Sequence, residues 1–326
     1  MMKRVLILAP RLDVMFKEGT VPTERGPISE IRQHWHNFAR AVEWAHVSAG
    51  DIVNTIELPL WQFNPELIAP ENLKPDIVYV PHREEHQFPL PAGIEARYYM
   101  QSVFPHIFYV DSKGYAAGSS WYPMKVPGVP NHREPNGIYD ALSARAARNE
   151  SKFDQPVPTK IPDELRGYIL FACQIPHDYV ISAHSEVSVD FALNDCLKTA
   201  ASIGKWVIVK GHPVNPGSMK NLRAITAKYT HSASWCDSIN IHSLIEASSM
   251  VVTVNSGTGM EALLHKKPVM VYGRAEYDCV AMNPEITRDW VAPWFDEPLV
   301  RNFFDLWYDR VIDTTNPASV SRLVKD

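Results

Sequence analysis

The feature of this sequence that most constrains its fold is a regular alternation of apolar and amphipathic stretches between residues 167 and 273. Four short apolar runs have the length of buried strands, and stretches with helical spacing follow the first three. The apolar runs are 167–176, 205–213, 250–256 and 268–273, and the helical stretches are 189–204, 218–230, 238–249 and 257–267. This alternation predicts a parallel α/β sheet, which binds its ligands at the carboxyl ends of the strands.

The first half of the chain shows the same alternation less regularly. Three apolar runs predict strands and one stretch has helical spacing: 4–10, 75–81, 106–111 and 29–45. Residues 116–165 are rich in Pro and Gly around one helical stretch, 138–149, a composition typical of a region between domains.

A chain of 326 residues is long enough for two hydrophobic cores. We therefore expect two α/β domains, 1–155 and 156–295. The tail, 296–326, contains a helical apolar stripe, and we expect it to pack back on the first domain.

The composition argues against several classes of protein. The 32 Lys and Arg residues against 37 Asp and Glu give a net charge of −5, so nucleic acid is not an expected partner. The apolar run at 4–10 is too short for a signal peptide, and no run approaches the roughly 20 apolar residues of a membrane span. The 4 cysteines are scattered without metal-type spacing, which predicts reduced thiols and a cytoplasmic protein.

A glycine-rich turn, Asn255-Ser256-Gly257-Thr258-Gly259, separates a predicted strand from a predicted helix. Backbone N–H groups at such a helix start, together with the two hydroxyls, favour a phosphate group. The glycines allow close approach of a ligand and tolerate unusual φ values. A helix cap followed by a packing turn explains the same residues, and the turn alone does not decide between the two interpretations.

Two other predicted strands end in polar side chains. Lys210 and His212 follow the run at 205–213, and Gln174, His177 and Asp178 follow the run at 167–176. Because parallel strands end at one edge of a sheet, we expect these side chains to lie near the glycine-rich turn. His212 as a loop histidine and Asp178 as a turn cap remain the simpler alternatives.

The three strand ends together carry a resemblance to a known family. The motifs QIPHD (174–178), KGHP (210–213) and NSGTGMEALLHKKPVMVYGRAEYD (255–278) resemble those of the capsule polysaccharide biosynthesis proteins, which include bacterial retaining β-Kdo glycosyltransferases. The resemblance covers about 110 residues of the second half. It implies an α/β fold of the GT-B type, in which two Rossmann-like domains face each other across a cleft.

The resemblance also implies a mechanism. Asp178 would be the nucleophile that forms a glycosyl-enzyme adduct, since retention follows readily from two displacements at the anomeric carbon. A nucleotide sugar, with CMP-Kdo favoured, would be the donor, and no metal or further cofactor is expected. The residues implied in donor binding are Gln174, Lys210, His212, Asn255, Ser256, Gly257, Thr258 and Glu261, the last as a support for the ribose or the phosphate loop.

A glycan or glycolipid is the implied acceptor, with peripheral membrane association left open. A base that activates the acceptor hydroxyl is a candidate role for Glu24 or Glu30, although solvated loop charges are the commoner explanation. Two positions depart from the family pattern: Gly257 stands where Ser or Thr is frequent, and His177 where an acidic residue is frequent. These departures bear on the identity of the sugar more than on the fold.

Other functions remain open on the sequence. The HREEH stretch, 82–86, has the spacing of some zinc sites, but it follows a predicted strand, whereas that site requires a helix. A nucleotide-sugar 2-epimerase, a viral sugar transferase acting on modified DNA, and a non-catalytic sugar-nucleotide binding protein are alternatives to the glycosyltransferase.

Overall fold

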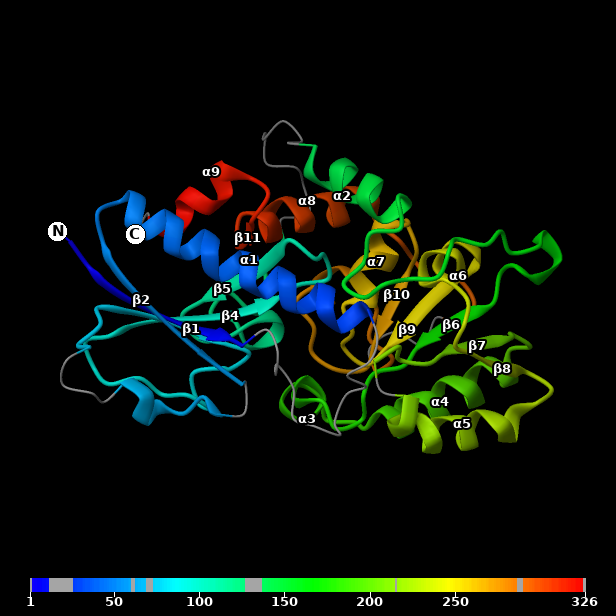
Figure 1. Cartoon of the computed structure of the whole chain (residues 1–326). Helices are drawn as coiled ribbons and strands as arrows, with labels where there is room; N and C mark the ends of the chain where they lie inside the picture. Colours follow the sequence, from blue (N-terminus) through cyan, green and yellow to red (C-terminus); the bar gives the residue numbers. More distant parts are fainter. Residues whose placement is uncertain are drawn as a thin grey trace. The chain divides into compact units, whose positions relative to one another are not determined.

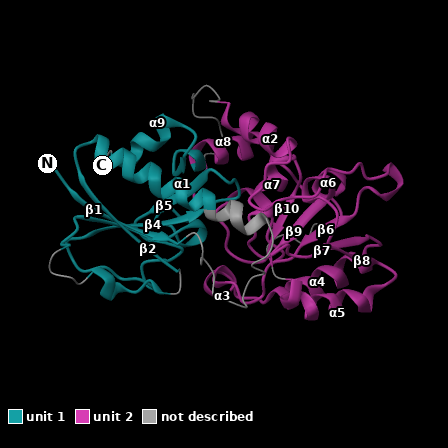
Figure 2. Cartoon of the chain, in the orientation of Figure 1, with its two compact units in different colours: residues 1–122, 307–326 teal, residues 123–306 magenta. Residues whose placement is uncertain are grey.

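The computed structural model describes residues 2–11, 26–59, 62–68, 73–126, 137–214, 216–285 and 290–324, and for 26–32 it describes the backbone alone. The chain forms two compact units, shown in different colours in Figure 2. Unit 1 consists of Met1–Tyr122 with Trp307–Asp326, and unit 2 is Pro123–Leu306.

This division differs from the domain bounds expected from the sequence. The first boundary lies at Tyr122–Pro123, about thirty residues before the expected position at 155, and the chain returns to unit 1 at Trp307. The tail that returns, Trp307–Asp326, is therefore shorter than the expected 296–326.

The helix of the proline-rich region explains the shift of the first boundary. α2 (Ile138–Ala147) packs against α7 (Thr258–Leu264) of the second unit. Tyr139, which is 2% exposed, donates a hydrogen bond from its hydroxyl to the Leu263 carbonyl at 3.0 Å. The many prolines of this region predict an irregular segment between domains. They do not show to which unit the segment belongs, which depends on the burial of α2 against α7.

Unit 1 is built on a six-stranded mixed sheet in the order β11-β5-β4-β3-β1-β2. Its strands are β1 (Arg4–Pro10), β2 (Ile52–Leu58), β3 (Ile77–Pro81), β4 (Glu95–Gln101), β5 (Ile107–Asp111) and β11 (Val311–Asp313). β1 to β4 pair in parallel, whereas β5 pairs antiparallel with both β4 and β11. α1 (Gly26–Ser48) packs on β1 and β2, and its residues Trp35, Phe38 and Val42 are each at most 2% exposed. The returning tail thus adds a strand as well as α9 (Pro317–Val320).

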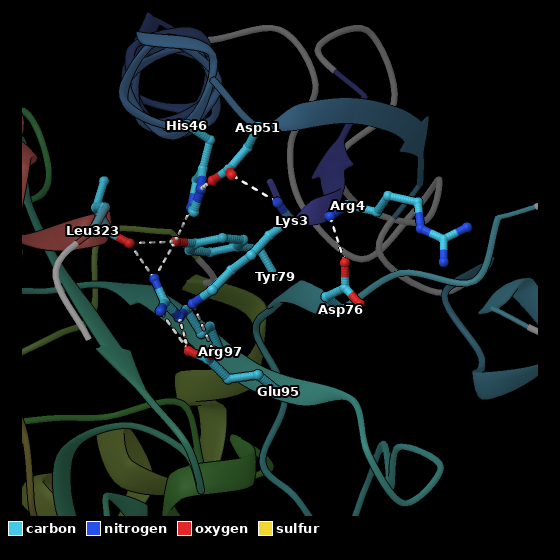
Figure 3. Close-up of polar contacts among 9 residues, drawn as sticks. All are labelled: Lys3, Arg4, His46, Asp51, Asp76, Tyr79, Glu95, Arg97 and Leu323. Carbon is cyan, nitrogen blue, oxygen red and sulfur yellow. Dashed lines mark hydrogen bonds and ion pairs between the residues drawn. The ribbon is translucent and has the colours of Figure 1, made fainter. Parts of the chain in front are cut away.

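A buried polar network lies at the amino ends of the unit 1 strands (Figure 3). His46, which is 1% exposed, lies 2.8 Å from an Asp51 carboxylate oxygen through Nδ1 and 2.9 Å from the Tyr79 hydroxyl through Nε2. Arg97 donates to the Tyr79 hydroxyl at 2.7 Å and to the Leu323 carbonyl. Burial lowers the pKa of His46, against the opposing effect of Asp51. The network joins α1, β3, β4 and the C-terminal segment, so its role is structural.

Unit 2 contains a five-stranded, wholly parallel sheet in the order β10-β9-β6-β7-β8. Its strands are β6 (Ile169–Ala172), β7 (Val207–Lys210), β8 (Ala233–Cys236), β9 (Met250–Thr253) and β10 (Val269–Val271). Its further helices are α3 (Tyr179–His184), α4 (Val189–Ser202), α5 (Lys220–Thr226), α6 (Ile241–Ala247) and α8 (Glu297–Tyr308), the last of which continues into unit 1.

Two layers of helices cover this sheet. Figure 1 shows α4 and α5 on one side and α2, α6 and α7 on the other. The apolar side chains of α4 that have helical spacing are buried against β6, which is why this amphipathic stretch folds as a helix on the sheet. None of the helices in the described part of the chain has both the length and the apolar character needed to cross a bilayer.

The strand order places three loops together. β6 lies between β7 and β9, and all three strands run in the same direction. The residues that follow them therefore meet at one carboxyl edge, as the sequence predicts.

Candidate functional site

Gln174 and Asn255 tie the end of β6 to the end of β9. Gln174 is 6% exposed and donates through Nε2 to Asn255 Oδ1 at 2.8 Å, while its Oε1 accepts from the Asn255 N–H at 2.9 Å and the Thr253 hydroxyl at 3.2 Å. Asn255 in turn donates through Nδ2 to the Val180 carbonyl at 2.9 Å. These bonds position the glycine-rich turn and α3 with respect to each other, which is a scaffolding task for both amides.

Asp178 lies in the loop after β6, at the residue that precedes α3. Its side chain accepts a long hydrogen bond, 3.4 Å, from the Val180 N–H, so it caps this helix. The carboxylate also interacts electrostatically with Lys152 and with His212. Asp178 therefore caps α3 and also lies beside two basic side chains, Lys152 and His212.

The glycine-rich turn is bonded internally. Ser256 Oγ accepts from the Thr258 N–H and donates to the Thr258 hydroxyl, both at 3.2 Å, and Tyr277 donates from its hydroxyl to the Ser256 carbonyl. Gly257 has φ −55° and ψ −21°, an ordinary helical conformation, so the expected unusual φ is not the reason for glycine there. At Gly259 the reason is space, because a Cβ atom would lie 2.2 Å from the Tyr277 hydroxyl.

Glu261 lies inside α7, below this turn, and is 4% exposed. Its Oε1 accepts a hydrogen bond from the Ser151 hydroxyl at 2.5 Å, and Thr258 donates to the same carboxyl group. Burial raises the pKa of Glu261 to about 7, against the effect of these two bonds. Its contacts support the turn from within unit 2.

We expect Glu261→Gln to be tolerated and to stabilise the protein relative to wild type as the pH rises from about 4.5 to 7, with no further gain above pH 7. The pKa of Glu261 in the folded protein, about 7, exceeds its ordinary value of 4.5, so the contribution of the protonated carboxyl group to stability is full below pH 4.5 and is lost between pH 4.5 and about 7. Glutamine keeps the acceptor oxygen without the charge. Urea unfolding at pH 5 and pH 8 should therefore show a change on the order of 3 kcal/mol in the free energy of unfolding of the variant relative to wild type.

Glu261→Ala is the contrasting variant, because it removes the acceptor for Ser151 and leaves a cavity at both pH values. The same pH dependence in wild type and Glu261→Gln would contradict a buried, titrating carboxyl group at this position.

Lys210 and His212 differ in their surroundings although both follow β7. Lys210 is 7% exposed, and its ammonium donates to the Asp237 carbonyl, beyond the end of β8, at 2.5 Å. This bond uses one of the three N–H donors of the ammonium group and directs it toward the end of β8.

His212 is a neutral hydrogen-bond donor. Its pKa is lowered to about 4, mainly by burial; the Asp178 carboxylate opposes this shift, and the Lys152 charge adds to it. Its Nδ1 accepts from the Val214 N–H at 3.2 Å, so the proton of the neutral ring is on Nε2. A phosphate oxygen would therefore receive a hydrogen bond from Nε2 rather than meet an imidazolium.

Three residues of the proline-rich region belong to this site although no sequence pattern marks them. Ser151 bonds to Glu261, and the ring centroid of Phe153 lies 5.2 Å from that of His212 in an edge-on arrangement. The Lys152 ammonium lies 5.8 Å from the Phe153 ring centroid. No strand or helix spacing marks these residues, since they follow α2 in an irregular segment. Tyr277 was within the recognised motif but was given no role.

Neither candidate acceptor base has a described side chain. Glu24 lies outside the described residues, and Glu30 lies in α1 where the side chain is not described. Residues 82–86 follow β3 as a turn, not as a helix. Within the described ranges, no three His, Cys, Asp or Glu side chains are grouped as a metal site would require.

Comparison with known proteins identifies the family. The model of the capsule polysaccharide biosynthesis proteins matches residues 90–292, more than half of the 326 residues. The chain belongs to this family. The capsule-family match begins inside unit 1 and includes all three strand-end motifs. No curated protein matches the chain significantly in sequence.

Solved structures similar to this capsule-family protein include two Kdo transferases. One, described as KpsC, beta Kdo 2,7 transferase, of Thermosulfurimonas dismutans, is 14% identical with a TM-score of 0.51, over 82% of this chain and 85% of that one. The other, described as KpsC, beta Kdo 2,4 transferase, of the same organism, is 17% identical with a TM-score of 0.49, over 82% and 86%. The first likeness shows a shared fold, and the predicted GT-B class with two Rossmann-like units is confirmed.

Proposed function

We propose that this protein is a retaining glycosyltransferase that moves Kdo or a related sugar from a nucleotide-sugar donor, with CMP-Kdo favoured, to a glycan or glycolipid acceptor. The observation that carries the proposal is the position of Asp178. It follows the central strand of a parallel sheet, beside His212 and next to the turn that Gln174 and Asn255 hold in place. Membership of the capsule family and the resemblance of its motifs to Kdo transferases support the same reading.

The proposed reaction takes place in two displacements. The Asp178 carboxylate attacks the anomeric carbon, a C–O bond forms, and the bond from that carbon to the donor phosphate breaks, with its electron pair leaving on the nucleotide. The acceptor hydroxyl then attacks the same carbon, loses its proton to a base, and releases the Asp178 carboxylate. Two inversions give net retention.

The leaving phosphate requires partners for its charge. His212 Nε2 can donate one hydrogen bond, and the Ser256 hydroxyl can exchange its bond to Thr258 for a bond to a phosphate oxygen. The Thr258 hydroxyl can do the same by giving up its bond to Glu261. Four further residues would support this phosphate site through the contacts described above: Gln174, Asn255, Gly257 and Glu261. Lys210 would hold the end of β7 in place through the Asp237 carbonyl.

A direct test is to measure the binding of CMP, UDP, GDP and ADP by calorimetry and then to assay sugar transfer from CMP-Kdo to a glycan or glycolipid acceptor. We expect the protein to prefer CMP and the product to keep the anomeric configuration of the sugar, as read by NMR. Binding of none of the four nucleotides would sink the proposal. Sugar-nucleotide isomerisation without transfer would favour the epimerase, and nucleotide binding without turnover the non-catalytic alternative.

We expect His212→Ala to weaken nucleotide binding by about 1.5 to 3 kcal/mol, the usual range for losing a hydrogen bond to a charged group. Because the ring is already neutral, wild-type affinity should not change with an imidazole titration between about pH 6 and 8. His231→Ala is a matched control, since His231 is exposed in the turn before β8. Unchanged calorimetric affinity in a folded His212→Ala protein would remove His212 from the donor site.

A further inference from the structure

The segment that follows α2 reaches two of the three strand ends at the carboxyl edge of unit 2. Ser151 is bonded to Glu261, below the turn after β9, and Phe153 contacts His212, after β7. Lys152 lies between these two contacts in the chain. Its flanking residues therefore hold it across the end of β6, where Asp178 lies.

Hydrogen bonds to the start of α6 and to its N-cap residue hold this segment on both sides of Lys152. Asn240 is fully buried, and its Nδ2 donates to Asn149 Oδ1 at 2.5 Å and to the Pro156 carbonyl at 2.6 Å. Gln155 Oε1 accepts from the Ile241 N–H at 3.2 Å. Because Asn149 and Pro156 share one donor nitrogen, the segment between them forms a closed loop of fixed position.

The charge of Lys152 acts on the groups of the proposed donor site. It interacts with the Asp178 carboxylate, and it is one of the causes that lower the pKa of His212. Burial lowers the pKa of Lys152 itself to about 8, against the effect of Asp178. The other lysine at this edge, Lys210, is bonded to the Asp237 carbonyl. Burial lowers the pKa of Lys210, against the smaller opposing effects of Cys236 and Asp237.

We propose that Lys152, rather than Lys210, supplies the positive charge of the donor site: its ammonium binds the phosphate of the nucleotide sugar and lies beside the Asp178 carboxylate. This inference rests on the proposed function for the ligand, but its electrostatic part stands on the unit 2 contacts alone. An ammonium that faces both the nucleophile and the departing phosphate stabilises negative charge before and after the bond to the sugar breaks.

The pairing of each lysine with its aspartate can be tested without a ligand. Competitive acetylation of the intact protein, followed by peptide mass spectrometry, gives the titration midpoint of each lysine. Asp178→Asn should lower the midpoint of Lys152 and leave that of Lys210 unchanged, whereas Asp237→Asn should do the reverse. A Lys152 midpoint that does not respond to Asp178→Asn would overturn the inference.

Ligand contact is tested with the nucleotide of the four-member panel that binds wild type most tightly. We expect it to slow acetylation of Lys152 about tenfold and that of Lys210 less than twofold. Lys152→Met should raise the dissociation constant about 10- to 100-fold, Lys152→Arg should restore most of the affinity, and Lys160→Met, an exposed lysine of the same region, should have no effect.

The proposed function and the role of Lys152 can each be contradicted without the other. If wild type binds none of the nucleotides, the proposed function fails, and the acetylation of the two aspartate variants still decides the pairing of Lys152 with Asp178. If a nucleotide binds and protects Lys210 but not Lys152, the proposed function stands and Lys152 is not the phosphate ligand.

Discussion

Replacing Asp178 with asparagine should reduce sugar transfer by about a thousandfold or more while nucleotide binding and folding persist. The amide has the shape of the carboxylate but lacks the charge that attacks the anomeric carbon. Asparagine is as good a helix N-cap as aspartate, so the cap on the Val180 N–H is kept. Steady-state rates with the donor and acceptor identified by the nucleotide panel measure the effect.

Two comparisons separate the nucleophile from the cap. Asp178→Ala should lose activity to the same degree and also lose about 1 kcal/mol of stability, because alanine cannot cap α3. Wild type incubated with donor and no acceptor should carry a sugar-sized adduct on the peptide that contains Asp178, by intact-protein and peptide mass spectrometry. Normal turnover by Asp178→Asn, or an inverted product, would rule out the double displacement at this residue.

Replacing Gly259 with alanine should destabilise the protein by about 3 kcal/mol, at the upper end of the range for overpacking a core. The new Cβ would lie 2.2 Å from the Tyr277 hydroxyl and 2.4 and 2.5 Å from two of its ring carbons. The ring is fully buried and its hydroxyl is bonded to the Ser256 carbonyl, so it cannot move aside without disturbing the glycine-rich turn. Urea unfolding gives the loss of stability, and nucleotide affinity should fall with it.

Gly137→Ala is the matched control for this substitution. Gly137 has φ +74° and no atom within 4 Å of a new Cβ, so alanine there is strained in the backbone but meets no neighbour. Its expected cost is about 1 kcal/mol. If Gly259→Ala were no more destabilising than Gly137→Ala, the close approach of Tyr277 would not be the reason for glycine at 259.

The order of elements in unit 2 could be read largely from the chain. β6, β9 and β10 are buried throughout and β7 is buried except for the half-buried Ile208, so each is a largely apolar run, and α4 has a clear apolar face. Strand direction follows from the alternation with helices, and with it the meeting of three loops at one edge. These features depend on local spacing and on rules of connection, which a single sequence contains.

The sequence does not predict four other strands, β2, β4, β8 and β11, and the reason is physical. β2 is an edge strand with a mostly exposed pattern, and β4 carries charged and aromatic residues in place of an apolar run. β8 and β11 have four and three residues. Such strands exist because a neighbouring strand supplies their hydrogen bonds, and pairing of this kind leaves little trace in local composition.

For the site, the sequence by itself determined which polar side chains leave the strand ends: Gln174, Asp178, His212 and the turn that begins at Asn255. Only the tertiary structure decided what they touch. It directs Lys210 to the Asp237 carbonyl, and it places Lys152, from an irregular segment more than twenty residues earlier in the chain, within electrostatic range of Asp178. Spacing along a strand or helix predicts the face on which a side chain lies, whereas contacts between distant segments depend on how buried groups such as Asn240 and Glu261 satisfy their hydrogen bonds.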